Sequence, residues 1–347
     1  MRVLVLILVA AMACWATSPS SYAEPFHRDN TLSITPIPDL IMKGEQSPKK
    51  GKRILRVLLF GPPPTREFHF VRSILFRRDK GHRIEPTIVL PKDLEIPREF
   101  GDRIVQFPTH LVRPKRKDKL PGLAEFDVIV AIDPDWSQLS DQQWLLLRRW
   151  VAGTTGGGLI IVAGPTHAHQ LAKRDQKRRE KAFHALTKML PVSLHDARES
   201  GRVPKYNTTR PWTLTFSKAA RSYDFLNISR NKKAPLKGWQ DYFWEGGKPK
   251  PGKEPFYGFY TYYPVKAVHP KTVVLASFNG PKATWMTKKQ RQPWIAVRSV
   301  GAGKTAYVGS GELWRLRRYD SASHERFWLG LINYVGQGAA GKKASSE

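Results

Sequence analysis

The fold is decided by the run Phe126-Asp127-Val128-Ile129-Val130-Ala131-Ile132, which is almost continuously apolar. Strands of this composition are typical of parallel sheets that are covered on both faces. Residues 53–60 also have a buried-strand pattern, residues 159–163 form another apolar run, and residues 84–90 predict a further strand. Together these segments predict four strands.

Helical patterns lie between and after these runs. Apolar residues recur at spacings of three and four from Phe68, and Thr65 is the expected N-cap of that helix. A second helix is expected after the capping box of Ser140 and Gln143, and another over residues 179–189. This alternation of strands and helices predicts an α/β protein with a doubly wound parallel sheet and helices on both faces.

The rhythm changes after residue 190. Residues 191–265 are rich in aromatic and turn residues and predict a β-containing insertion. Ten aromatic residues fall within 239–263, and either a small core or a partly exposed binding surface would account for them. A closing helix is expected around Phe327. Between the insertion and this helix, further strands are expected at residues 272–278, 294–300 and 304–308.

Two glycine-rich stretches resemble nucleotide-binding loops, but the residues around them do not fit that interpretation. Gly301-Ala302-Gly303-Lys304-Thr305 lacks the first glycine of a phosphate loop, because position 298 is arginine, and it continues into a strand. It predicts a hairpin turn. Gly156-Gly157-Gly158 precedes a strand, which favours a helix C-cap and a tight turn.

The N-terminus has the pattern of a secretory signal peptide over residues 1–23. Arg2 is followed by an apolar run of 11 residues, Val3 to Ala13, and by Ser21-Tyr22-Ala23, a cleavage site of small residues. The alternative is a lipoprotein modified at Cys14, the single cysteine. Residues 24–52 predict a flexible lead-in, and residues 337–347 a disordered tail. Export to the periplasm or the medium is expected.

The chain is strongly basic, with 58 Lys and Arg against 29 Asp and Glu, a net charge of +29. Such a charge attracts polyanions. In an exported protein, an anionic polysaccharide or another envelope protein is the expected partner. Nucleic acid is not expected, because the chain carries none of the common nucleic-acid-binding motifs. We expect no cofactor, and no transmembrane helix in the mature chain. The oligomeric state stays open.

Candidate site residues follow the carboxyl ends of the strands, where open α/β sheets bind ligands. A metal- or carboxylate-dependent reaction could use Asp133, His167 and Glu312. His324 and Glu325 lie on a helix whose apolar face is elsewhere, so we expect them at the surface. The ligand-binding candidates are Asp133, Asp135, Thr166, His167, Glu312, Trp314 and Arg315.

Eight stretches carry a resemblance when taken in order: 66–75, 126–130, 139–150, 156–164, 259–265, 301–304, 309–315 and 326–328. Together they resemble the glutamine-amidotransferase-like domain of bacterial envelope proteins. The resemblance implies a flavodoxin-like, class I glutamine amidotransferase-like domain over residues 53–336. Members with that activity carry a nucleophilic cysteine after a central strand and a His-x-Glu pair. Here the corresponding segment, Val162-Ala163-Gly164, has no cysteine, and His-x-Glu occurs nowhere.

The sequence therefore predicts a fold that is kept without amidotransferase chemistry, because the covalent intermediate needs a nucleophile. The leading hypothesis is an exported, non-catalytic binding or scaffold protein. One alternative is a carbohydrate-active or metal-dependent enzyme, since Gly156-Gly157-Gly158-Leu159 is similar to the strand entry of trehalose-utilisation-type domains. The other alternative is a charge-driven binder of envelope polyanions.

Overall fold

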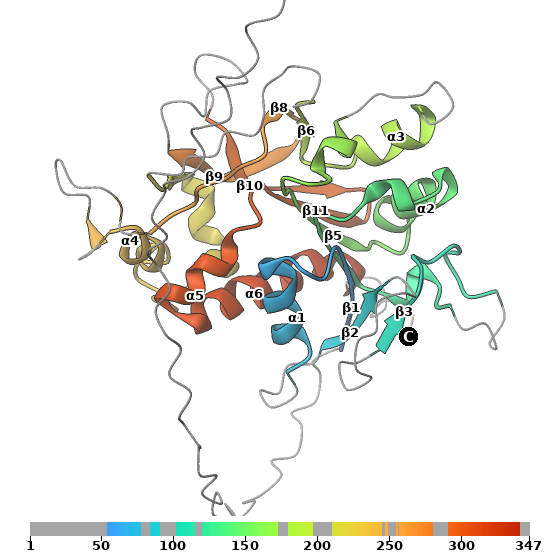
Figure 1. The fold of residues 1–347 in the computed structure, drawn as a ribbon, viewed down its shortest axis with the longest axis horizontal. Coiled ribbons are helices and arrows are strands. Elements are labelled where there is room, and N and C mark those ends of the chain that lie inside the picture. The colour runs from blue at the N-terminus through green and yellow to red at the C-terminus, as the bar shows by residue number, and fades with distance from the viewer. Residues whose placement is uncertain are drawn as a thin grey trace, which may run out of the picture. The chain divides into compact units, whose positions relative to one another are not determined.

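One mainly parallel sheet organises the chain (Figure 1). The signal peptide and the lead-in predicted above lie outside the described residues, as do residues 341–347. The computed structural model describes residues 54–77, 84–90, 102–114, 120–172, 180–196, 210–244, 247–248, 255, 257–279 and 291–340.

Within those residues the sheet has nine strands. Their order is β3 (Asp102–Ile104), β2 (Ile84–Val89), β1 (Leu55–Phe60), β4 (Val128–Ile132), β5 (Gly158–Val162), β11 (Gly303–Val308), β10 (Pro293–Val300), β9 (Thr272–Asn279) and β7 (Thr213–Phe216). In this order the strands from β3 to β11 are parallel, and β10, β9 and β7 extend the sheet with antiparallel pairing.

The central order β2-β1-β4-β5-β11 is that of a flavodoxin-like sheet, 2-1-3-4-5. The prediction of a flavodoxin-like α/β fold is therefore confirmed. Strands β6 (Val192–Leu194) and β8 (Val265–Val268) pair with each other in a separate two-stranded sheet.

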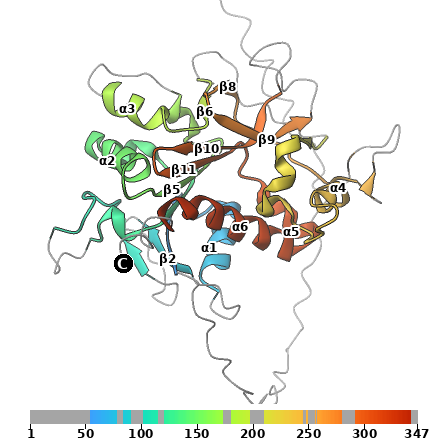
Figure 2. The ribbon, with the colours of Figure 1, turned by 180° about the vertical axis from the view of Figure 1, so that it is seen from behind.

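Helices cover both faces of the sheet, as the alternation predicted. Side chains alternate along β1, so this strand contributes to two cores. Val57 and Leu59 belong to the core under α1 (Arg66–Leu75) and α6 (Ser321–Ala340). Leu58 and Phe60 belong to the core under α2 (Asp141–Ala152) and α3 (Glu180–Thr187). Figure 2 shows α2 and α3 together, apart from α1 and α6.

Local signals set the ends of these helices. Thr65 accepts a hydrogen bond from the Phe68 N–H, and Ser140 forms the predicted capping box with Gln143. The C-cap of α2 is Gly153, three residues before the glycine run that was expected to supply it. Gly157 instead allows a close approach: a Cβ there would lie 2.2 Å from the Trp150 ring.

The turn between β10 and β11 is the predicted hairpin. Gly301 has a φ of 57°, and Val300 pairs with Gly303 in the antiparallel ladder. Lys304 lies in β11 rather than at the start of a helix, which excludes a phosphate loop. Helix α6 reaches Ala340, beyond the residue at which the tail was expected to begin.

The aromatic segment 239–263 is mainly core. Of its nine described aromatic side chains six are buried, including Trp239 and Tyr242 of α4 (Lys237–Phe243). Five of the six belong to the core that includes Trp294 of β10, on the face of the sheet that α6 covers, and Tyr263 belongs to the core on the other face. Tyr260 stays partly exposed. Among the helices that the structure describes, none is long and apolar enough to span a membrane.

Candidate functional site

The predicted site residues fall into two groups at the carboxyl edge of the sheet. The first group follows β4 and β5 and centres on Asp133, which is buried. The Thr166 N–H donates to its Oδ2 at 2.9 Å, and the His167 N–H donates to its Oδ1 at 3.0 Å. A Cβ at Gly164 would lie 2.4 Å from Oδ2, so glycine there lets the two strand ends approach.

Asp133 has a φ of 39°, in the left-handed region that Asp tolerates better than most residues. Burial raises the pKa of its carboxyl, although the N–H groups of Thr166 and His167 oppose this rise. The side chain thus fastens the turn before η4 (Ala168–Leu171) to the end of β4.

Asp135 caps η3 (Trp136–Gln138) and is also held within the protein. Its Oδ1 accepts from the Ser137 hydroxyl at 2.6 Å and from Gln170 Nε2 at 2.8 Å. Partial burial favours the neutral form, but these hydrogen bonds hold the pKa of Asp135 below its ordinary value. His167 Nδ1 lies 4.0 Å from the same oxygen. The first group therefore joins two strand ends through internal hydrogen bonds.

The second group lies on the segment after β11. Glu312 Oε2 accepts from the N–H groups of Tyr260 and Thr261, at 2.6 Å and 2.9 Å. Its Oε1 accepts from Arg315 Nη2 at 2.9 Å. This carboxylate fastens the connection before β8 to η8 (Leu313–Arg315) and orients the guanidinium of Arg315.

Trp314 and Arg315 are partly exposed and stack with their neighbours. The Arg315 guanidinium lies 4.5 Å from the Tyr260 ring centroid and 4.6 Å from that of Trp314. Arg66, the first residue of α1, lies 4.6 Å from the Trp314 centroid. Cation–π contacts of this kind hold the rings and the guanidinium groups in a fixed arrangement.

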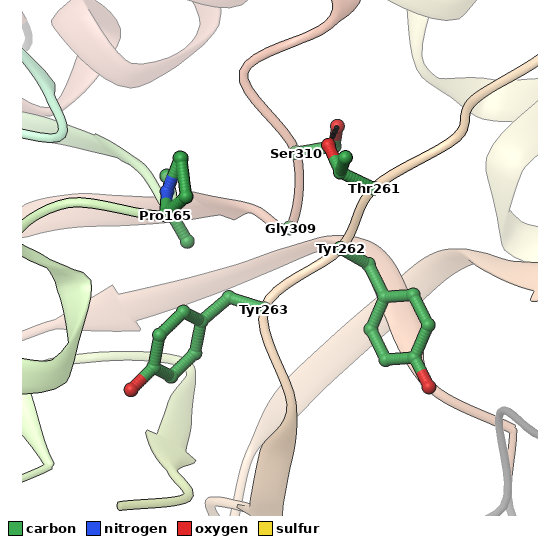
Figure 3. Close-up of a pocket in the computed structure, with 8 residues that line it drawn as sticks. Pro165, Thr261, Tyr262, Tyr263, Gly309 and Ser310 are labelled. Atoms are coloured by element: carbon green, nitrogen blue, oxygen red, sulfur yellow. Dashed lines mark hydrogen bonds between the residues drawn. The ribbon is translucent and has the colours of Figure 1, made fainter. Parts of the chain in front are cut away.

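A small hollow separates the two groups (Figure 3). It lies between the end of β5, at Gly164 and Pro165, and the end of β11, at Gly309 and Ser310. The segment with Thr261 forms its remaining wall, and the Thr261 and Ser310 hydroxyl oxygens lie 3.5 Å apart. Its cavity volume is about 10 Å³, the room of about one water molecule.

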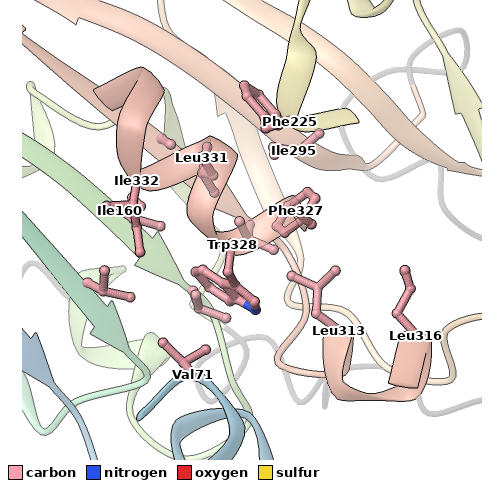
Figure 4. Close-up of a cluster of buried hydrophobic side chains, with 14 of the residues drawn as sticks. Val71, Ile160, Phe225, Ile295, Leu313, Leu316, Phe327, Trp328, Leu331 and Ile332 are labelled. Carbon is pink, nitrogen blue, oxygen red and sulfur yellow. The ribbon is translucent and has the colours of Figure 1, made fainter. Parts of the chain in front are cut away.

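A buried polar cluster, which the sequence analysis missed, lies beneath the second group. Glu67 Oε2 accepts from the Trp314 N–H at 2.6 Å. Its Oε1 accepts from Trp328 Nε1 at 2.8 Å and lies 3.0 Å from His324 Nε2. Trp328 Nε1 also lies 3.2 Å from His324 Nε2. Because a carboxylate only accepts, we assign a proton to His324 Nε2, and Trp328 Nε1 then donates to Glu67 alone. Figure 4 shows Trp328 among Val71 and Leu313 in the surrounding apolar core.

This cluster corrects the expectation that His324 and Glu325 lie at the surface: His324 is fully buried and Glu325 is 8% exposed. The sequence contained a signal. Glu67 precedes Val71 and Ile74 at spacings of four and seven, so a charged residue stands on the apolar stripe of α1. His324 stands in the same way on the stripe of α6.

The part of the chain that the structure describes contains no cluster of side chains that could bind a metal ion. No three His, Cys, Asp or Glu side chains there come close enough together to hold a metal ion. Asp133 and His167 are therefore not joined by Glu312, the third residue of the predicted reactive set.

Comparisons with known proteins give structural likeness alone. No family model and no curated protein matches the sequence. Similar solved structures include the cytoplasmic proteins STM1381 and STM3548 of Salmonella typhimurium, with TM-scores of 0.43 and 0.45 and identities of 14% and 13%. Each match covers 81% of this chain and 99% of the other. A ThuA-like protein from Parabacteroides merdae has a TM-score of 0.40 at 10% identity, over 83% of this chain and 91% of that one. These values are too low to carry an argument about function, and the fold class rests on the strand order.

Proposed function

We propose that this chain is an exported, non-catalytic binding protein of the cell envelope, which takes its ligand at the carboxyl edge of the sheet. The observation that carries the proposal is the segment after β11 that holds Glu312, Trp314 and Arg315, which we name the Glu312 turn. The Glu312 carboxylate accepts hydrogen bonds from the backbone N–H groups of Tyr260 and Thr261 and from the Arg315 guanidinium. The turn thereby holds Trp314 and Arg315 in place on a partly exposed surface.

The state of the carboxylates at this edge supports binding over acid–base catalysis. A general acid or base must exchange a proton with the substrate and so needs an accessible oxygen. Asp133 is buried and bonded to two backbone N–H groups, and Asp135 is bonded to Ser137 and Gln170. The hollow between the strand ends, about 10 Å³, is too small for a sugar ring or a peptide.

A thermal-shift screen of the purified protein tests this function. The panel holds neutral glycans, acidic polysaccharides and peptides. A ligand at 100 times its dissociation constant adds about 2.7 kcal/mol, which shifts the melting temperature by several degrees. We expect Trp314→Ala to remove that shift. Leu145→Ala, which trims a 45% exposed side chain on α2, should keep it.

Two results would contradict the proposal. One is a ligand that stabilises the protein and the Trp314→Ala variant equally. The other is turnover of a ligand that Asp133→Asn abolishes, which would favour the carbohydrate-active alternative. Export has its own check: amino-terminal sequencing of the protein from its native cell should begin at Glu24, after the predicted cleavage site.

A further inference from the structure

Four arginines gather around the exposed side of the Glu312 turn. They come from the start of α1, from η8 and from α5 (Leu316–Tyr319). Two aromatic side chains of the site join them. We name this set the arginine–aromatic surface; it comprises Arg66, Tyr260, Trp314, Arg315, Arg317 and Arg318.

The guanidinium groups are arranged on rings. Trp314 has three of them around its centroid, those of Arg66 and Arg315 at 4.6 Å and that of Arg318 at 5.7 Å. The fourth, Arg317, lies 4.2 Å from the centroid of Phe70, which follows Arg66 by one turn of α1. Three cations therefore gather at Trp314 and the fourth lies at a second ring, so the set spans two aromatic side chains.

Among the described residues, negative charge does not balance this group of cations. Among the described residues, Glu312 is the carboxylate that pairs with it, and it pairs with Arg315. Arg66, Arg317 and Arg318 have no carboxylate partner in that part of the chain, and Arg66 and Arg318 are exposed.

Holding these charges together is unfavourable in the free protein. Arg66 and Arg315 each lie 4.6 Å from one centroid, so their guanidinium carbons are at most twice that distance apart. That separation is comparable with the Debye length of about 8 Å at physiological salt, so the two charges repel. Arg66 also stands at the positive end of the α1 dipole, where a cation is disfavoured. Bound anions would relieve both effects.

We infer that the arginine–aromatic surface binds an acidic polysaccharide, whose repeated carboxylate or sulfate groups pair with successive guanidinium groups. This inference rests on the proposed function and names the ligand class of the same edge. Guanidinium groups suit such ligands because their fork of N–H donors matches the two oxygens of an oxyanion. A polymer suits this arrangement, since it presents several anions at once.

Other polyanions fit the surface less well. Single-stranded nucleic acids stack their bases on free aromatic faces, whereas guanidinium groups already pack around the Trp314 ring. A lipid surface needs apolar side chains that insert beside the cations. Among the large apolar side chains that are exposed in the described residues, only Tyr319 is next in sequence to a member of this set, Arg318.

The test compares two double variants that remove equal charge. Arg66→Gln/Arg318→Gln alters the surface, and Arg148→Gln/Arg149→Gln alters two exposed arginines of α2. The probes are fluorescein-labelled alginate, labelled dextran sulfate and, as a neutral control, labelled dextran. Binding is measured by anisotropy over a series of salt concentrations, and the melting temperature of each variant checks folding.

We expect wild type to bind both acidic polymers and not dextran. The surface variant should lose about tenfold or more in affinity, since two charge-assisted hydrogen-bonding groups are removed, and the α2 variant should lose less than about threefold. The salt dependence should weaken only in the surface variant. Arg66→Lys/Arg318→Lys, which keeps the charge but not the fork, should fall between wild type and the Gln variant.

Three results would overturn the inference. Equal losses in the two Gln variants would mean that net charge drives binding. Equal binding of dextran would mean a neutral glycan site, and the proposed function would then stand without this ligand class. If neither acidic polymer binds, the ligand class is wrong, and the separate thermal-shift panel with Trp314→Ala still decides the proposed function.

Discussion

Replacing Glu67 by glutamine removes the charge of the buried cluster with almost no change of shape. In the protein, Glu67 accepts from the Trp314 N–H through Oε2 and from Trp328 Nε1 through Oε1, with His324 Nε2 3.0 Å from Oε1. All three groups are donors. A glutamine has one carbonyl oxygen and one NH₂ group, which also donates.

The loss in stability follows from this count. The glutamine oxygen is best placed toward Trp328 and His324, where it accepts twice. The NH₂ group then faces the Trp314 N–H, so one strong hydrogen bond is lost and a buried donor is left unpaired. Hydrogen bonds to charged groups contribute about 1.5–3 kcal/mol, and we expect Glu67→Gln to lower the free energy of unfolding by that amount.

Equilibrium urea unfolding, followed by tryptophan fluorescence, measures this change. The matched control is Glu85→Gln, because Glu85 pairs with Arg56 at the surface, where both side chains are 55% exposed. Such a pair contributes little, so the control should stay within about 0.5 kcal/mol of wild type. A Glu67→Gln variant as stable as the control would refute the cluster's role in holding the Glu312 turn on α1.

Three further changes test the fold. Gly157→Ala should lower the free energy of unfolding by about 1–3 kcal/mol, because its Cβ would lie 2.2 Å from the buried Trp150 ring; Gly311→Ala, with no atom within 4 Å of the added Cβ, should be tolerated, and equal effects in urea unfolding would contradict this packing. Ser140→Ala should lose about 1 kcal/mol by removing the α2 cap, while Ser140→Asp should retain most of it in the same assay. A hydrogen bond from Arg113 lowers the pKa of Glu125, so its contribution is present above the ordinary value of 4.5 and is lost as the pH falls through the lower folded value. Wild type should therefore exceed Glu125→Gln in stability at pH 7, and the difference should shrink below pH 4.5; a constant difference would exclude this ion pair as its source.

The parts of the fold that the sequence predicted depend on neighbours within a few residues. The apolar runs of β1, β4 and β5 indicated strands buried on both faces, and the caps at Thr65 and Ser140 set the starts of α1 and α2. Short strands were not predicted, because they are held by partners that are distant in sequence. Strand β7 has four residues and pairs with β9, so Thr213 lies opposite Asn279 across 66 positions of sequence.

For the candidate site, too, the sequence indicated the position but not the long-range contacts. The rule that ligands bind beyond the strand ends directed attention to Asp133 and to the Glu312 turn. It could not indicate which backbone N–H groups donate to these carboxylates, because those groups are 33 to 52 residues away. The Glu67 cluster joins residues 247 to 261 positions apart.

By itself, the sequence determined the longer strands and helices, their apolar character, and that the chain is strongly basic, since these properties follow from composition and local periodicity. Only the tertiary structure decided that His324 is buried against Glu67 and that arginines from α1, η8 and α5 share the Trp314 ring. The physical reason is that periodicity reports whether a side chain faces the core, whereas its hydrogen-bond and charge partners depend on how distant segments pack together.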